Sequence, residues 1–301
     1  MTNAPEDVVS LASERAEARA SKDFARADAL REEIANLGWV VKDTTDGYAL
    51  SVKPPYDVLD RTADLPTSVG TYPVTVGLVI DGWPDDVRTC IAALLAHCSA
   101  QIVALDCGNV DGAGDVVHEL ATANPTRIIE LHLAMNPGWS AAQIALLKVC
   151  DGPVHVVMDL SSVLDGDAIA PLADAIGDGV VAAGWKGANV NVDDAWRSVD
   201  DAGPGEVDVV LSYLMAVDRS AARTTGPHPK ARFYRNADLE WSLLLREAGG
   251  RIVVPVAELP VHQERHRGYH DSDPELRDRE SKKTYDRILA RFRGKTELLH
   301  H

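Results

Sequence analysis

The feature that most constrains the fold is a series of short apolar runs, separated by helical patterns, that begins at residue 74. The runs lie at 74–80, 102–105, 127–133, 154–158 and 180–183, and the helical patterns between them include 112–123, 138–150 and 167–176. Strands that alternate with helices form crossover units and a mainly parallel sheet. Further strands are expected at 207–217 and 251–256. The sequence therefore predicts an α/β domain with a mixed, mainly parallel sheet flanked by helices.

Charged residues follow several of these strands directly. Asp106 comes after the run at 102–105, Asp159 after 154–158, and the basic cluster His262, Arg265 and Arg267 after 251–256. Ligands bind at the carboxyl ends of the strands in an open α/β sheet. These residues are thus candidates for one binding site, although an Asp after a strand also commonly caps the helix that follows.

Composition excludes several classes of protein. The 301 residues carry a formal charge of −16, which argues against a general nucleic-acid binder because binding to phosphates needs basic surface. The four cysteines show no CxxC pairing, so a zinc site or a disulfide framework is not indicated. No apolar run reaches the roughly 20 residues of a membrane span, and no signal-peptide pattern is present. We expect a cytoplasmic protein.

The first part of the chain has a different pattern. Helical periodicity runs from Val8 to Leu37, Gly38 is placed to end the second helix, and Asp46-Gly47 is typical of a hairpin turn. A polar, Pro-marked stretch follows. We therefore predict a helical hairpin module at 1–53, a linker at 54–72, the α/β domain at 73–270 and a C-terminal helix packed on the core within 271–301.

The order of several segments in this domain resembles the pattern of glycosyltransferase family 2, whose members have the GT-A fold. The resemblance lies in the Asp106 turn, Asn136-Pro137-Gly138, Asp159-Leu160-Ser161 and the helix that begins near Asn236. It implies an inverting transfer of a sugar from a nucleotide diphosphate sugar to an acceptor that the sequence does not identify. It further implies that Asp106 and Asp159 bind the donor nucleotide and that a His near His262 binds metal or diphosphate. Because Arg can offset the charge of the diphosphate where a metal carboxylate is missing, we also expect Arg265 and Arg267 to bind the diphosphate.

The resemblance also implies that Asp238 is the base that deprotonates the acceptor. Glu240 lies two residues further along the same helix, so the two side chains do not face the same way. We choose Asp238 as the base and assign Glu240 a structural or acceptor-orienting role. The other interpretation is that both acids only stabilise the positive end of the helix dipole.

Asp159-Leu160-Ser161 stands where the family has Asp-x-Asp, whose carboxylates hold a divalent cation. Ser161 is a poorer ligand for a hard cation, but Mg²⁺ needs few protein ligands. Three interpretations stay open. Asp159 and His262 hold Mg²⁺ or Mn²⁺, or Arg265 and Arg267 replace the metal, or the site has lost activity. The family's usual Arg and Asn are also missing near Gln143 and Ile144.

The N-terminal module resembles the C-terminal module of cysteinyl-tRNA synthetases, through Lys22-Asp23-Phe24, Ala27-Asp28, Leu30-Arg31 and Gly38. The catalytic signatures of the synthetases are absent, and the charges of the module are mixed rather than basic. We therefore expect docking on its own chain, on a partner protein or in a homo-oligomer, and we consider nucleic acid the weaker alternative.

Two further functions remain as alternatives. A non-catalytic sugar-nucleotide-binding or scaffold protein would explain Ser161, Gln143 and Ile144. A nucleotidyltransferase would be expected to carry a glycine-rich, basic loop after the first strand, where this chain has Asp81-Gly82-Trp83-Pro84.

Overall fold

The computed structural model describes residues 4–70, 72–263 and 273–300. The predicted basic residues Arg265 and Arg267 lie outside these ranges. The chain divides into two compact units, Met1–Asp57 and Val58–His301.

The N-terminal unit consists of two helices and a hairpin, as the sequence predicts. Its elements are α1 (Glu6–Ala20), α2 (Phe24–Asn36), β1 (Trp39–Thr44) and β2 (Gly47–Val52). Asp23 caps α2 by accepting a hydrogen bond from Arg26 N, and Gly38 follows this helix with a positive φ of 79°. A small core of Val8, Ala12, Ile34 and Val41 holds the helices against the hairpin.

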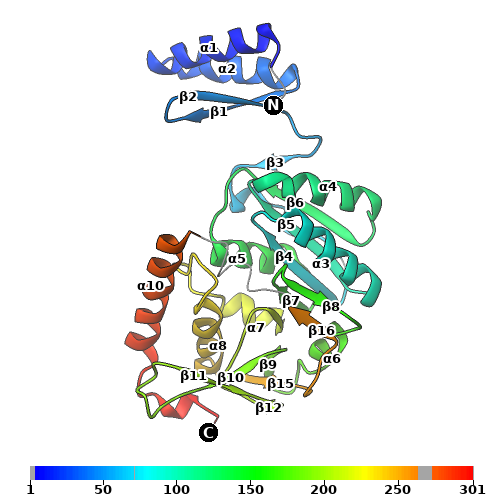
Figure 1. Ribbon diagram of the computed structural model, residues 1–301, viewed down its shortest axis with the longest axis vertical. Coiled ribbons are helices and arrows are strands. Elements are labelled where there is room, and N and C mark those ends of the chain that lie inside the picture. Colours follow the sequence, from blue (N-terminus) through cyan, green and yellow to red (C-terminus); the bar gives the residue numbers. More distant parts are fainter. Residues whose placement is uncertain (1–3, 71, 264–272, 301) are drawn as a thin grey trace. The chain divides into compact units, whose positions relative to one another are not determined.

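The second unit is built on a nine-stranded sheet (Figure 1). In spatial order its strands are β12 (Gly205–Glu206), β15 (Arg251–Val254), β9 (Val180–Gly184), β14 (Leu214–Asp218), β7 (Val154–Met158), β4 (Val74–Ile80), β5 (Gln101–Cys107), β6 (Ile128–Leu133) and β3 (Val58–Leu59). Neighbours from β7 to β3 pair in parallel, whereas β14 is antiparallel to both its neighbours. The predicted mixed, mainly parallel sheet is confirmed.

Helices cover both faces of this sheet. On one face, α3 (Pro84–His97), α4 (Ala113–Ala123) and α6 (Ile169–Asp174) contribute to a core with β4, β5 and β7. On the other face, α5 (Trp139–Val149), α7 (Arg219–Thr224) and α8 (Ala237–Glu247) pack on the sheet in two adjoining clusters. Burial of apolar area on both faces is the main stabilising term of such a fold.

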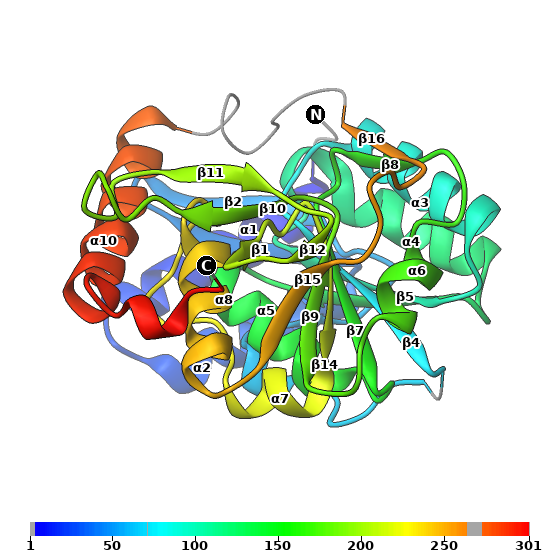
Figure 2. The ribbon, with the colours of Figure 1, turned by 90° about the horizontal axis from the view of Figure 1, so that it is seen from below.

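The C-terminal helix α10 (Pro274–Phe292) belongs to a separate apolar cluster, on the side of the domain where Figure 2 shows it near α8. Phe292 and Ile288 of α10 pack there with Leu243 and Leu244 of α8. The same cluster includes residues of a three-stranded sheet formed by β10 (Gly187–Val190), β11 (Val199–Ala202) and β13 (Val209–Val210). A last pair, β8 (Ser162–Leu164) and β16 (Val261–Gln263), is antiparallel.

Two segments differ from the expectation. The stretch 54–72, expected to be a linker, contributes β3 to the sheet edge and the 3-10 helix η1 (Thr62–Asp64), and Val69 N donates to Val149 O. The strand expected at 207–217 is two strands in different sheets, β13 and β14. It is interrupted at Ser212, whose backbone N–H donates to the side chain of Asp238 instead of to a neighbouring strand.

Candidate active site

A pocket of about 450 Å³ lies at the carboxyl ends of β4 and β7. This volume falls within the range of about 300–1,000 Å³ that is usual for small-molecule sites. Its wall carries the aromatic side chains of Trp83, Trp139, Tyr213, Phe233 and Tyr234. The charged residues of the wall are Asp81, Asp159, Arg232, Asp273, Arg279 and Glu280. A site of this kind can hold a polar, charged molecule against aromatic faces.

Asp159 follows β7 directly and lines the pocket, as expected from its place after a strand. Its Oδ1 accepts hydrogen bonds from Ser161 N at 2.8 Å and from Ser161 Oγ at 2.5 Å. Ser161 Oγ in turn accepts from Gln263 Nε2 at 2.8 Å. Ser161 and Gln263 therefore fix the orientation of the Asp159 carboxylate.

The structure does not bring His262 to Asp159. The His262 side chain is 46% exposed, and its Nδ1 lies 2.7 Å from Asp165 Oδ2. Successive residues of a strand point to opposite faces. Gln263, the next residue of β16, is therefore the one that reaches the Ser161–Asp159 pair.

Asp238 is buried, with 7% of its surface exposed, and it does not line the pocket. Its Oδ2 accepts from Ser212 N at 3.0 Å and from Ser212 Oγ at 3.2 Å, and its Oδ1 accepts from Leu239 N. Burial raises the pKa of Asp238, although the hydrogen bonds from Ser212 and Leu239 partly oppose this effect. Ser212 and Tyr213 do line the pocket, so they separate Asp238 from it.

Glu240 has a different environment on the same helix. Both its carboxylate oxygens accept hydrogen bonds from the guanidinium of Arg287 in α10, at 2.8 and 2.7 Å. The Glu240 side chain is only 3% exposed. Of the two roles expected for Glu240, this geometry fits the structural one, because the pair joins α8 to α10.

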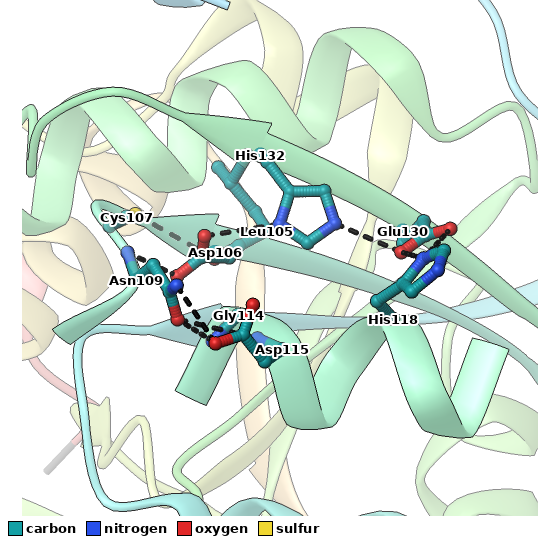
Figure 3. Close-up of polar contacts among 9 residues, drawn as sticks. All are labelled: Leu105, Asp106, Cys107, Asn109, Gly114, Asp115, His118, Glu130 and His132. Carbon is teal, nitrogen blue, oxygen red and sulfur yellow. Dashed lines mark hydrogen bonds and ion pairs between the residues drawn. The ribbon is translucent and has the colours of Figure 1, made fainter. Parts of the chain in front are cut away.

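Asp106 is the next-to-last residue of β5, but it is 1% exposed and lies in an internal network rather than on the pocket wall (Figure 3). His132 Nδ1 lies 3.1 Å from Asp106 Oδ2, and His132 Nε2 lies 2.9 Å from Glu130 Oε2. Glu130 also contacts His118 Nδ1 at 3.0 Å. Burial disfavours the charged form of His132, but the hydrogen bonds to Asp106 and Glu130 outweigh it and raise its pKa.

The network also holds the turn between β5 and α4. Asp106 Oδ1 accepts from Asn109 N at 3.0 Å, and Asn109 Oδ1 accepts from Gly114 N at the start of α4. Within this turn, Val110 packs against Gly82, where a Cβ would come within 3.3 Å of it. Gly82 lies between Asp81 and Trp83 of the pocket wall, so the turn held by Asp106 is packed next to that wall.

Sequence reasoning missed several residues of the pocket. Asp81 follows β4 as Asp159 follows β7, and this repeated placement was a usable signal. Arg232 lies in an irregular segment without a pattern, and no described carboxylate contacts its guanidinium. Arg279 pairs with the neighbouring Glu280. Among the residues that the structure describes, Arg232 is therefore the pocket cation without a protein counterion.

Comparison with known proteins decides the family. Residues 83–238, more than half of the chain, match glycosyl transferase family 2. The chain belongs to glycosyltransferase family 2. The fold agrees, because the second unit has the GT-A architecture of two solved glycosyltransferase structures.

The first is the mannosyltransferase PcManGT from Pyrobaculum calidifontis in complex with GDP-Man and Mn²⁺. It has a TM-score of 0.57 and 17% identity over 82% of this chain and 72% of that one. The second is GalNAc-T7 with UDP, GalNAc and Mn²⁺, with a TM-score of 0.59 and 16% identity over 73% of this chain and 48% of that one. Identities this low establish the shared fold and nothing finer.

The N-terminal residues have a separate similarity. Residues 2–48 match the cysteinyl-tRNA ligase anticodon binding domain. Cysteine–tRNA ligases of Opitutus terrae and of Nitratidesulfovibrio vulgaris strain Miyazaki F are 54% identical over 46 residues and 58% identical over 48 residues. These stretches cover 15% and 16% of this chain and 10% of each ligase. The chain thus spans about a tenth of the length of these curated relatives.

The carboxylates on the described pocket wall form no three-ligand cluster for a cation. No group of three His, Cys, Asp or Glu residues that could hold a metal occurs in the described part of the chain. Asp159 supplies one carboxylate, and its Oδ1 already accepts hydrogen bonds from Ser161. These residues do not fit a cation held by the protein alone, but one carboxylate suffices for Mg²⁺ or Mn²⁺ that is also bound by substrate phosphates.

No helix in the described residues is long and apolar enough to span a membrane.

Proposed function

We propose that the Val58–His301 unit is a glycosyltransferase that passes a sugar from a nucleotide diphosphate sugar to an acceptor nucleophile with inversion at the anomeric carbon. The observation that carries the proposal is the pocket at the carboxyl ends of β4 and β7 with Asp159 on its wall, in a chain of family 2. Its charged and aromatic wall suits a molecule that combines a diphosphate, a base and a sugar.

Asp159 is proposed to bind the donor diphosphate through a divalent cation that arrives with it. The phosphate oxygens of a nucleotide sugar would bind Mg²⁺ or Mn²⁺ together with Asp159, and the cation would offset the charge that develops on the leaving diphosphate. Arg232 supplies further positive charge in the pocket. The role proposed for Arg265 and Arg267 in binding the diphosphate concerns residues outside the described ranges.

Asp238 is proposed as the base that accepts the acceptor proton. Its raised pKa makes it a better proton acceptor than an ordinary aspartate. For Asp106, complete burial supports a positioning role, through the turn at Asn109 and Val110, in place of direct contact with the nucleoside.

A non-catalytic sugar-nucleotide-binding protein is the second candidate. It is favoured by the hydrogen bonds that engage Asp159 Oδ1 with Ser161 and both oxygens of Asp238 with Ser212 and Leu239. Such a protein would bind the donor in the same pocket and release no nucleotide.

The experiment that separates these functions incubates the full chain with a panel of UDP- and GDP-sugars, with and without Mn²⁺, and measures free nucleoside diphosphate. Without an added acceptor, we expect slow hydrolysis of at least one donor, accelerated by Mn²⁺. Binding without release would favour the non-catalytic function, and neither binding nor release for any donor would rule out both.

A further inference from the structure

Ser212 and Tyr213 lie between the predicted base and the pocket, and Ser212 contacts the base directly. Asp238 does not line the pocket, whereas Ser212 does, and the Ser212 hydroxyl lies 3.2 Å from Asp238 Oδ2. Ser212 occupies the interruption between β13 and β14 and is itself 6% exposed. The Ser212 hydroxyl therefore offers a route for a proton from the pocket to Asp238.

The hydroxyl has the bonding capacity for this task. A serine hydroxyl donates one hydrogen bond and has two lone pairs that accept. Ser212 Oγ uses its proton toward Asp238, and no other described side chain or backbone group donates to it. Its lone pairs are thus not used by any described donor.

The backbone holds the hydroxyl in place. Ser212 N donates to the same Oδ2 of Asp238, at 3.0 Å, so two bonds from one residue converge on one oxygen. The backbone bond does not depend on the serine side chain. The position of Asp238 and the presence of the hydroxyl can therefore be varied separately.

We propose that Ser212 relays the acceptor proton to Asp238. This inference rests on the glycosyltransferase function proposed above and assigns a second residue to its proton-transfer step. Ser212 touches the acceptor, and Asp238 acts through Ser212.

In this step the acceptor hydroxyl gives its proton to Ser212 Oγ while Ser212 gives its own proton to Asp238 Oδ2. The acceptor oxygen forms a bond to the anomeric carbon of the donor sugar. The bond from that carbon to the diphosphate oxygen breaks, and its electron pair leaves with the nucleoside diphosphate. Ser212 ends the step as a neutral hydroxyl, and Asp238 ends it protonated.

A purely structural role for Ser212 makes a different prediction, and the chain contains a matched control. Ser242 is a completely buried serine of α8 whose hydroxyl also joins this helix to the neighbouring strand, through Val210 N at 3.2 Å and Val210 O at 3.3 Å. Ser242 does not line the pocket. Ser212→Ala and Ser242→Ala thus each remove one buried hydroxyl that links α8 to a neighbouring segment. Only Ser212→Ala also removes the proposed relay.

The test measures nucleoside diphosphate release from the most reactive sugar nucleotide of the panel, donor affinity by calorimetry, and melting temperature. For Ser212→Ala we expect a loss of kcat of about 10²-fold or more, as is typical of a removed acid–base group, with donor Kd within about twofold of wild type. Ser212→Thr keeps a hydroxyl and should recover much of the rate. Ser242→Ala should lower the melting temperature and leave kcat unchanged.

A proton inventory in mixtures of H₂O and D₂O adds a readout that a structural role would not move. Two protons move together in the relay, so the wild-type rate should vary non-linearly with the fraction of D₂O. Ser212→Thr should show the same non-linear dependence. Wild-type turnover in Ser212→Ala, with Asp238→Asn inactive, would overturn the relay and leave the proposed function standing. A wild-type chain that releases nothing from any donor would overturn the function itself and the relay with it.

Discussion

Asp106, Asp159 and Asp238 are all short carboxylates at the end of a strand or the start of a helix, yet their surroundings differ. Asp159 lines the pocket, Asp238 lies behind Ser212, and Asp106 is enclosed with His132. Sequence position placed each near the carboxyl edge of the sheet. The direction in which each side chain points depends on neighbours that are distant in the sequence.

The Asp106–His132–Glu130 contacts predict a pH-dependent stability. The pKa of His132 is raised in the folded state, so its protonation stabilises the fold fully below the unfolded pKa of about 6.5, and this contribution is lost as pH rises through the folded pKa. We expect the stability difference between wild type and His132→Gln to be larger at acid pH than at alkaline pH. Urea denaturation of both proteins across this range measures it. A difference that stays constant with pH would contradict the assignment of a charged His132.

At the scale of elements, the Glu240–Arg287 pair joins α8 to α10, and the first turns of α10 line the pocket. Arg287→Ala leaves a carboxylate that is 3% exposed without its partner, which should cost about 3 kcal/mol. The control is Lys282→Ala, which breaks an exposed pair with Asp286 on the same helix and should cost less than about 1 kcal/mol. Chemical denaturation measures the free energy of unfolding of both variants. Equal losses of stability would show that the buried pair contributes no more than the exposed one.

The order and type of most elements could be predicted because apolar periodicity directly reflects burial. The apolar runs at 74–80 and 154–158 match β4 and β7 closely, and the helix expected at 138–150 differs from α5 by one residue at each end. Two-residue strands leave no such pattern. This is why β3, within a Pro-marked stretch, was not predicted.

The site was predicted less completely, because its details depend on register and on long-range contacts. His262 and Gln263 are adjacent in the sequence, but strand alternation directs only Gln263 to Ser161. Arg232 lies in an irregular segment whose backbone is held by α5, through Trp139 N and Arg232 O. No local pattern marks Gln263 as a partner of Ser161, or Arg232 as part of the pocket.

At the scale of the whole molecule, two units with different relatives share one chain. The Met1–Asp57 unit resembles an anticodon-binding domain, yet it carries seven Lys and Arg residues against eleven Asp and Glu residues. We propose that its role is docking to a protein, either a partner or a second copy. Its exposed apolar side chains, which include Val9, Phe24, Leu37 and Val52, are consistent with this role.

This charge balance predicts that the full chain does not bind tRNA appreciably. Binding to phosphate needs basic residues that displace counterions, and the affinity then falls steeply between about 50 and 200 mM salt. Fluorescence anisotropy with labelled tRNA should show no saturable binding at either salt concentration. Saturable binding that weakens as salt rises would contradict the prediction and favour a retained RNA contact.

The central claim is that the pocket at Asp159 binds the diphosphate of a sugar nucleotide, and calorimetric titration with UDP and GDP in the presence and absence of Mn²⁺ tests it most directly. We expect Mn²⁺ to tighten the binding of at least one nucleotide by about tenfold, equivalent to about 1.4 kcal/mol. Asp159→Asn should abolish this gain, whereas Asp165→Asn, which alters an exposed carboxylate paired with His262, should keep it. Equal nucleotide affinity and equal response to Mn²⁺ in wild type and Asp159→Asn would contradict the claim.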